Sequence, residues 1–279
     1  MFRTVTPPRL MAVLAHPDDE SLGIGGTLAK YASEGVDVFL LTATRGDNGH
    51  YRGYSTADRQ HPGSSALAKI RETELRAAAA ELGVREVSLL DYRDQHLDRA
   101  DPREAVAAIA RHLRRVQPQV VVTFGPDGAY GHPDHVAISQ FTTAAVVAAA
   151  DSSFAADRTE TAPAHAVSKL YYVAWPESAW SAYRAAFGKL LSTVDGVERR
   201  PVPWPDWAVT TFLDTRAVWL RVWRAISCHE SQIAANDRLQ QLSAADHEAL
   251  WGRQFFYRAF STVSGGRARE SDLFEGIRS

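Results

Sequence analysis

Short apolar runs rich in β-branched residues alternate, over the first 175 residues or so, with longer segments whose apolar positions recur at helical spacing. This alternation is typical of βαβ units, in which helices join the parallel strands of one sheet. We predict strands at residues 10–14, 36–42, 86–90, 120–124 and 170–173. We predict helices at residues 25–34, 70–82, 102–116 and 135–149. The pattern therefore indicates an α/β fold with a mostly parallel sheet and helices on both faces.

The pattern changes after residue 175, where tryptophans and prolines gather in an irregular region. A further strand is predicted at 209–213, followed by helices at 215–228 and 243–260. Residues 264–279 carry many charges and glycines, which is typical of a poorly ordered tail. Because no repeat or low-complexity linker divides the chain, we expect a single domain over 1–279. Its core would span about 9–175, and a strand and helix extension about 176–262.

Composition excludes several classes of protein. The 31 basic and 33 acidic residues give a formal charge of −2, which gives no support for a nucleic-acid or membrane partner. The single cysteine, Cys228, excludes a disulfide framework and a cysteine-rich zinc site. Any metal must therefore be held by histidines and carboxylates. The N-terminal residues match neither a signal peptide nor a membrane span, so we expect a cytoplasmic protein, and the sequence is compatible with a homo-oligomer.

The most concentrated chemistry directly follows the first predicted strand, where Ala15-His-Pro-Asp-Asp-Glu20 places one imidazole beside three carboxylates. Carboxylates this close repel one another, and a bound cation is the simplest way to offset that repulsion. The alternative is a polar turn around Pro17 that caps the next helix. We favour the interpretation that this cluster forms half of a metal site.

A second cluster, Tyr130-Gly-His-Pro-Asp-His135, also follows a buried type of strand, at 120–124. In a doubly wound sheet of order 3-2-1-4-5 the first and fourth strands are neighbours, and their carboxyl ends border one crevice. We therefore expect the two clusters to face each other. Alone, the second cluster would fit a helix N-terminus with surface histidines.

A catalytic zinc site uses three ligands of the His, His, carboxylate kind and keeps one position open for water. His16 supplies one ligand, and Asp18 or Asp19 another. The i, i+3 spacing of His16 and Asp19 favours Asp19 as the ligand and leaves Asp18 as the general base. Such a site predicts one Zn²⁺ per chain, although another divalent transition metal would also fit.

The third ligand comes from His132 or His135. Pro133 suits the first position of a helix, which places His135 in its first turn, so we favour His135. His132 and Tyr130 are then free to assist at a carbonyl oxygen, His132 in its protonated form. Amide or ester hydrolysis is the chemistry that such a site favours.

The two motifs, Ala15-His-Pro-Asp-Asp-Glu20 and Gly131-His-Pro-Asp-His135, resemble those of the PIG-L/LmbE-like family of zinc-dependent N-acetylglucosamine de-N-acetylases. The resemblance extends from about residue 9 to 262. It implies a Rossmann-like fold and removal of an N-acetyl group from a small aminosugar molecule. It also implies His16, Asp19 and His135 as zinc ligands, Asp18 as base, and His132 and Tyr130 at the tetrahedral intermediate.

The resemblance further suggests substrate contacts for three residues. Arg71 and Asp94 match family positions near the sugar hydroxyls, although Arg71 could instead pair with Glu72 or Glu74 on a helix surface. His229 either approaches the substrate or packs. Three features stay open: the role of Glu20, the role of Asp47 and the long loop 46–65. Asp47 belongs to the segment Thr44-Arg-Gly-Asp47, where relatives often have Gly-Glu, so the acid near the site is shorter here.

Other functions are also conceivable for this sequence. Gly23-Ile-Gly-Gly26 does not match a dinucleotide fingerprint, and the acids before it would repel phosphates. A hydratase or lyase with a related metal site, an amidase acting on a sugar-thiol conjugate and a non-catalytic sugar-binding protein are the alternatives. The sequence does not identify the group attached to the sugar.

Overall fold

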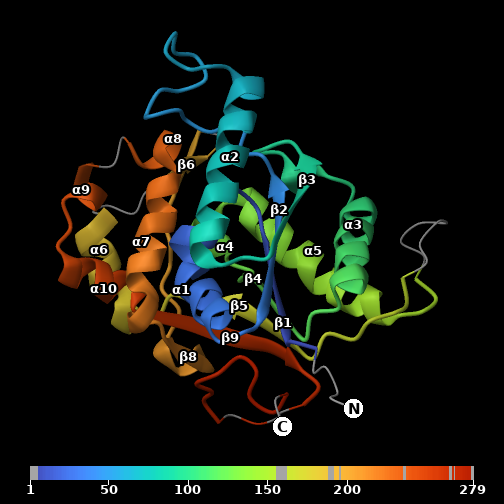
Figure 1. The fold of residues 1–279 in the computed structure, drawn as a ribbon. Coiled ribbons are helices and arrows are strands. Elements are labelled where there is room, and N and C mark those ends of the chain that lie inside the picture. Colours follow the sequence, from blue (N-terminus) through green and yellow to red (C-terminus); the bar gives the residue numbers. More distant parts are fainter. Residues whose placement is uncertain are drawn as a thin grey trace.

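A seven-stranded sheet forms the centre of the molecule (Figure 1). The computed structural model describes residues 6–154, 162–187, 192–194, 196–234, 237–263, 266 and 268–277. The strand order is β3-β2-β1-β4-β5-β9-β8, and the first five strands are parallel. The parallel strands are β1 (Arg9–Leu14), β2 (Asp37–Thr44), β3 (Glu86–Tyr92), β4 (Val120–Phe124) and β5 (Lys169–Val173). The α/β fold and the central strand order are as the sequence predicts.

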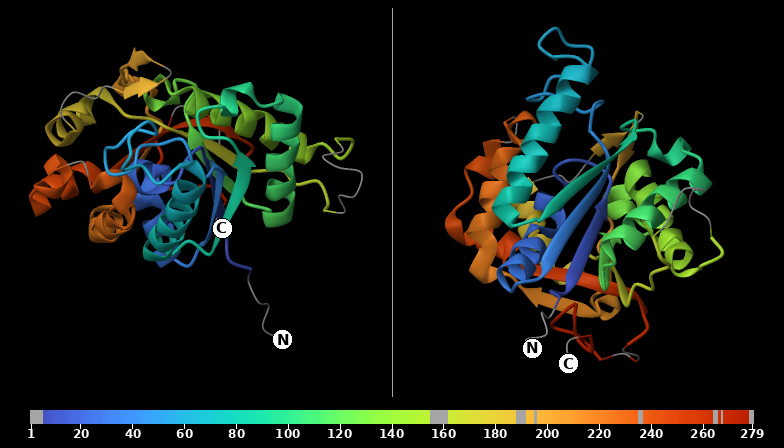
Figure 2. Two further views of the ribbon diagram at one scale, coloured as in Figure 1. Left: turned by 90° about the horizontal axis from the view of Figure 1, so that it is seen from above. Right: turned by 45° about the vertical axis from the view of Figure 1, so that its right-hand side comes forward.

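Helices cover both faces of the sheet (Figure 2). One face carries α1 (Asp19–Ser33), α2 (Ser64–Leu82) and α7 (Trp219–Cys228), and the other carries α3 (Pro102–Val116) and α5 (Pro133–Ala150). Strands β1 and β4 lie between these layers and are almost wholly buried, as their continuous apolar sequences require. The shorter helices are α4 (Gly128–Gly131), α6 (Trp180–Phe187), α8 (Glu230–Ile233), α9 (Asp237–Gln240) and α10 (Ala244–Trp251).

The predicted helix over 243–260 is wrong in its second half. Helix α10 ends at Trp251, and residues after Gly252 form β9 (Arg253–Ser261), which pairs antiparallel with β5 and with β8 (Thr211–Asp214). The run Phe255-Phe256-Tyr257 is rich in aromatic residues that favour strands, and pairing with a distant strand decides the outcome. Separately, β6 (Ser192–Val194) and β7 (Val197–Arg199) form a small hairpin.

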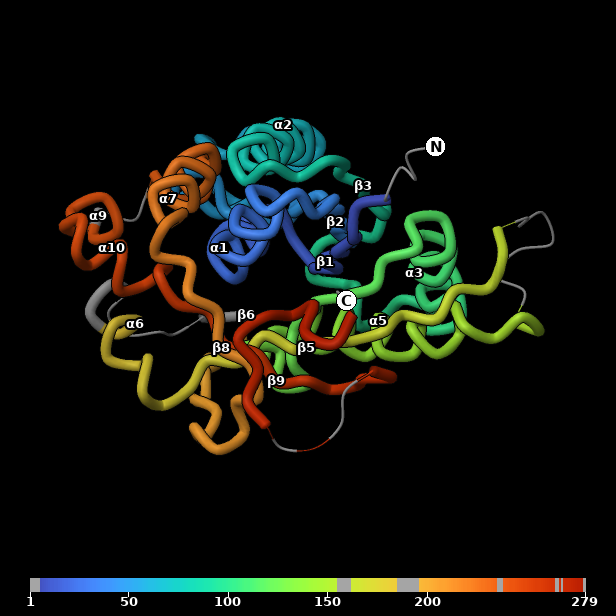
Figure 3. Tube along the Cα trace, turned by 60° about the horizontal axis from the view of Figure 1, so that its bottom comes forward, coloured from blue at the N-terminus to red at the C-terminus, as the bar shows by residue number. Residues whose placement is uncertain are grey.

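The predicted poorly ordered tail is also wrong for the residues described there, 266 and 268–277. Leu273 and Phe274 are fully buried, and the carboxylate of Glu270 accepts hydrogen bonds of 2.7 Å from both Lys169 and Tyr171. Figure 3 shows this segment from below, where it passes the end of the sheet at which β5 begins. The charge of Glu270 is paired inside the protein, which composition alone does not reveal. The other tail residues lie outside the described part of the chain.

Within the described residues, no helix combines the length and the apolar character needed to cross a bilayer.

We predict that Phe274→Ala lowers the free energy of unfolding by about 3–5 kcal/mol, because it leaves a cavity in the core. Val202→Ala, at a side chain that is 73% exposed, should change it by less than about 0.5 kcal/mol. Chemical denaturation measures both. Equal, small effects would mean that the C-terminal segment is not part of the core.

Candidate metal centre and active site

Three histidines meet at the carboxyl ends of β1 and β4. His16 follows β1, while His132 and His135 lie at the start of α5, beyond β4. One nitrogen of each imidazole lies within 4.8 Å of the others, and all three side chains are buried. The two sequence clusters therefore converge, as the strand order predicts.

The predicted ligand atoms are spaced as they would be around a cation with tetrahedral coordination. His16 Nδ1 lies 3.1 Å from His135 Nε2. Asp19 Oδ1 lies 3.4 Å from His135 Nε2, and Asp19 Oδ2 lies 3.6 Å from His16 Nδ1. Two atoms bound at about 2.0–2.1 Å to a tetrahedral ion are roughly 3.3 Å apart, so this set fits a zinc-like ion. The ring of Phe124 stacks on the imidazole of His135 with centroids 4.0 Å apart, which restricts the orientation of that side chain.

The Asp19 carboxylate is ionised and fixed. Burial alone would raise its pKa, but the nearby charges of His135 and His16 hold the pKa well below its usual range. Its Oδ2 also accepts the backbone N–H of His16 at 2.8 Å. Asp19 thus faces both predicted histidine ligands with its orientation set by the backbone.

Two carboxylates contact the imidazole of His16 at the nitrogen that points away from His135. Nε2 of His16 lies 3.1 Å from Asp94 and 3.1 Å from Asp134. Burial alone would lower the pKa of His16, but these acids outweigh burial and raise the pKa well above its ordinary value. Histidines that bind metals usually donate their second N–H to such a carboxylate, which fixes the ring.

Sequence reasoning missed Asp134, although it stands between His132 and His135 in the second motif. It is fully buried and accepts the backbone N–H groups of Gln95 (2.8 Å) and Leu97 (3.0 Å) as well as facing His16. Its position after a predicted helix-starting proline was the available signal. Asp134 joins α5 to the turn that follows β3.

Asp94, predicted as a sugar contact, is engaged by the protein. One of its oxygens faces His16, and the other accepts the backbone N–H of Asn48 at 3.1 Å. Asp47, whose role the sequence left open, accepts the backbone N–H of Asp94 at 3.1 Å. In this structure both residues hold the surroundings of His16.

Arg71 pairs with Asp18 rather than with a neighbour on its own helix. Its guanidinium is buried and donates to the Asp18 carboxylate at 3.1 Å, to the carbonyl of Pro17 and to that of Gly46 at 3.1 Å. The alternative of a surface pair with Glu72 or Glu74 is wrong. Glu72 instead accepts hydrogen bonds from Arg45 and Arg76, and Glu74 accepts one from Ser231.

The Asp18 carboxylate is suited to gain and lose a proton near neutral pH. Burial raises its pKa to about 6, against the opposing effect of Arg71. A general base works best when its pKa lies near the working pH. Asp18 also has a φ of 106°, in the region that favours glycine.

The imidazole of His132 is neutral near pH 7, in contrast to the protonated form that we expected from the sequence. Its Nδ1 accepts the backbone N–H of Asp134, so the proton of the neutral ring sits on Nε2. Burial, followed by the charges of His16 and His135, lowers its pKa to about 3. His132 therefore offers an uncharged N–H donor. The ring of Tyr130 stands edge-on to His132 and His135, at 5.8 and 5.3 Å between centroids.

His229 packs, which was one of its two predicted roles. It is fully buried, and its Nε2 lies 2.7 Å from the carboxylate of Glu20. The segment 229–232 also holds the loop 46–65. Ser231 accepts the backbone N–H of Arg52 through its carbonyl, and Gln232 donates to the carbonyl of His50 at 2.9 Å.

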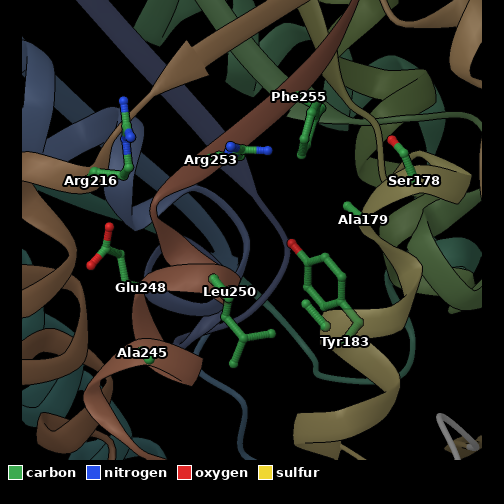
Figure 4. A pocket seen from close by; sticks show the side chains of 11 residues that line it. Ser178, Ala179, Tyr183, Arg216, Ala245, Glu248, Leu250, Arg253 and Phe255 are labelled. Atoms are coloured by element: carbon green, nitrogen blue, oxygen red, sulfur yellow. The ribbon is translucent and has the colours of Figure 1, made fainter.

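A separate cavity of about 560 Å³ lies among the short 3₁₀ helix η2 (Glu177–Ala179), α6, α10 and the start of β9 (Figure 4). Arg253 and Tyr183 face it, while Arg216 beside it is paired with Asp214. None of the predicted site residues lines this cavity. It is distinct from the metal centre.

Comparison with known proteins agrees with this geometry. The sequence profile of the family described as PIG-L, GlcNAc-PI de-N-acetylase, matches residues 11–146. A 1D-myo-inositol 2-acetamido-2-deoxy-alpha-D-glucopyranoside deacetylase of Rhodococcus jostii is 35% identical, covering 96% of this chain and 98% of its own. A protein of the same name from Kineococcus radiotolerans is 36% identical, covering 97% and 83%. The chain belongs to the PIG-L family. Its relatives in these two organisms are deacetylases that act on an amide bond.

Solved structures share the fold. The 4-carboxy-2-hydroxymuconate hydratase of Pseudomonas putida superposes with a TM-score of 0.67 at 20% identity, covering 94% of this chain and all of the other. The N,N'-diacetylchitobiose deacetylase of Pyrococcus horikoshii gives 0.66 at 21% identity, covering 90% and 83%. At these identities the two structures support the fold alone.

We predict that Asp134→Asn lowers the free energy of unfolding by about 1–3 kcal/mol in the presence of a chelator. The amide cannot accept from both backbone N–H groups, so a buried donor loses its partner. Asp98→Asn, at an exposed position close by, is the matched control and should have an effect below about 0.5 kcal/mol. Chemical denaturation measures the free energy of unfolding of both variants. If the two variants are equally stable, Asp134 does not hold this turn.

Proposed function

We propose that this protein is a zinc-dependent N-deacetylase of a small aminosugar molecule. Its substrate would contain a 2-acetamido-2-deoxy-α-D-glucopyranoside unit, and the inositol-linked sugar named for its relatives is the first candidate. One observation carries the proposal. A ligand set with tetrahedral spacing lies beside a carboxylate with a pKa near 6, in a chain related over its whole length to deacetylases.

His16, Asp19 and His135 would hold one Zn²⁺, and the same atoms would accept another divalent transition metal. A bound ion would supply a Lewis acid that activates water and polarises the acetamido carbonyl. Asp18 takes the proton that water loses as it adds to the carbonyl carbon. When the C–N bond breaks, Asp18 returns that proton to the leaving amine, so the products are acetate and the free aminosugar.

The remaining side chains act on the carbonyl oxygen and on Asp18. The Nε2–H of His132 and the hydroxyl of Tyr130 donate to the negative charge that develops on this oxygen. A neutral imidazole suits this task because its donor needs no protonation near pH 7. Arg71 holds the Asp18 carboxylate, while Asp94 and Asp134 orient His16.

We predict that the purified protein releases acetate from inositol-linked N-acetylglucosamine, with one free amine per acetate. Chelation should abolish turnover and Zn²⁺ should restore it. His16→Ala should lose the ion, whereas Asp18→Asn should keep one ion per chain and lose roughly 10²- to 10⁴-fold in turnover. Metal analysis and an acetate assay measure these effects, with His112→Ala as a control outside the site.

Two results would contradict this function. Turnover of an unsaturated acid without acetate release would indicate a hydratase. Sugar binding without any turnover, in protein that carries its ion, would indicate a binding protein.

The proposal also fixes the direction of a pH effect. Asp18 must be ionised to act as base, so the rate rises with pH through its pKa, at or below about 6 because a bound cation also lowers it. Arg71→Met removes a positive charge that lowers this pKa, so the acidic limb of kcat/KM should move to higher pH. Arg71→Lys retains the charge and should move it less. If the acidic limb of kcat/KM does not move in Arg71→Met, a group other than Asp18 determines that limb.

A further inference from the structure

Glu20 is completely enclosed and lies outside the ligand set. Its Oε2 accepts the backbone N–H of Asp18 at 2.9 Å, and its Oε1 meets the hydroxyl of Ser21 and, at 2.7 Å, Nε2 of His229. A buried carboxylate is costly unless hydrogen bonds or charges compensate it. These three contacts provide that compensation, and one of them falls on the proposed base.

The backbone of Asp18 needs support because its φ is 106°. A residue other than glycine in such a conformation costs about 1–3 kcal/mol and persists only where its surroundings impose it. Arg71 holds the Asp18 side chain and the carbonyl before it, whereas Glu20 holds the Asp18 N–H. The two contacts together fix where the carboxylate of the base points.

His229 reaches Glu20 from a distant part of the chain, at the end of α7. It is fully buried, and its Nδ1 is without a partner among the described residues. An unsatisfied buried nitrogen costs about 1–3 kcal/mol, which an apolar side chain would avoid if packing were the only need. The contact with Glu20 accounts for an imidazole here.

The segment that carries His229 is itself anchored. Ser231 donates through its backbone N–H and its hydroxyl to Glu74 of α2, at 2.7 and 2.6 Å. Gln232 donates to the loop residue His50. His229 is therefore presented to Glu20 from a fixed support.

We propose that Glu20, held by His229, is a positioning residue that fixes the backbone of Asp18 and so aims its carboxylate at the reacting water. This inference rests on the proposed function. Neither Glu20 nor His229 belongs to the ligand set, and both are too enclosed to contact substrate.

The first test is kinetic and uses the zinc-loaded full chain. Glu20→Ala and His229→Ala should each lower kcat by roughly 10- to 100-fold, with KM within about threefold and one ion per chain. The double variant should be no worse than the poorer single variant, because the two residues act as a unit. His229→Gln keeps an N–H donor and should recover part of the loss, as should Glu20→Gln, which keeps an acceptor.

Glu270→Gln is the matched control, because Glu270 is another buried, paired acid, at the opposite end of β5. It should lower the melting temperature and leave kcat unchanged. If the Glu20 and His229 variants behave in the same way, with stability reduced and kcat intact, their role is only structural and the inference is wrong.

A second measurement does not depend on turnover. The Asp18 amide hydrogen should exchange with solvent faster in Glu20→Ala and His229→Ala than in the wild-type protein, while amides of β4 keep their protection. Unchanged protection of Asp18 overturns the inference. If the wild-type protein releases no acetate from any acetamido sugar, the proposed function fails, and this measurement still decides whether Glu20 holds Asp18.

Discussion

The active site depends on how the protein compensates buried negative charge. Carboxylates from three segments are brought to the ends of β1 and β4, where water is largely excluded: Asp18, Asp19, Glu20, Asp94 and Asp134. Each has a particular partner, whether an imidazole, a guanidinium or a backbone N–H. His16, Asp19 and His135, the proposed ligands, lie next to one another among these groups. A cation held by these three residues, as we propose, would complete the compensation of the buried negative charge, so that metal binding and the folding of these loops would depend on the same charges.

Much of the fold was predictable because its first half is built from local patterns. Strand β4 and helix α3 begin and end where the sequence predicts, since their apolar runs and the proline at the start of α3 are local signals. Strand β9 and the C-terminal segment were not predictable. Their structure is decided by β5 and by Lys169, which lie about 100 residues earlier, and no local pattern encodes such a partner.

The active site likewise has parts that the sequence predicts and parts that it does not. The adjacency of β1 and β4 brings His16 and His135 together, and that adjacency follows from general rules of sheet topology. The partners of Arg71 and Glu20 could not be inferred in this way. Arg71 had plausible partners one and three residues away on its helix, yet it turns to Asp18, and His229 is separated from Glu20 by 209 residues. Sequence reasoning identified which side chains carry the chemistry, but not what holds them.

The distance between Glu20 and His229 also has a consequence for biosynthesis. A chain emerging from the ribosome presents the acidic turn after β1 long before α7 and His229, which follows this helix, exist. Strand β8 likewise has no sheet neighbour until β9, made some forty residues later, lies beside β5. Because Glu20 obtains its imidazole partner only from the residue that follows α7, the acidic turn cannot reach this charge-compensated arrangement before α7 and His229 have been synthesised. Assembly of the complete centre therefore comes late in the synthesis of these segments.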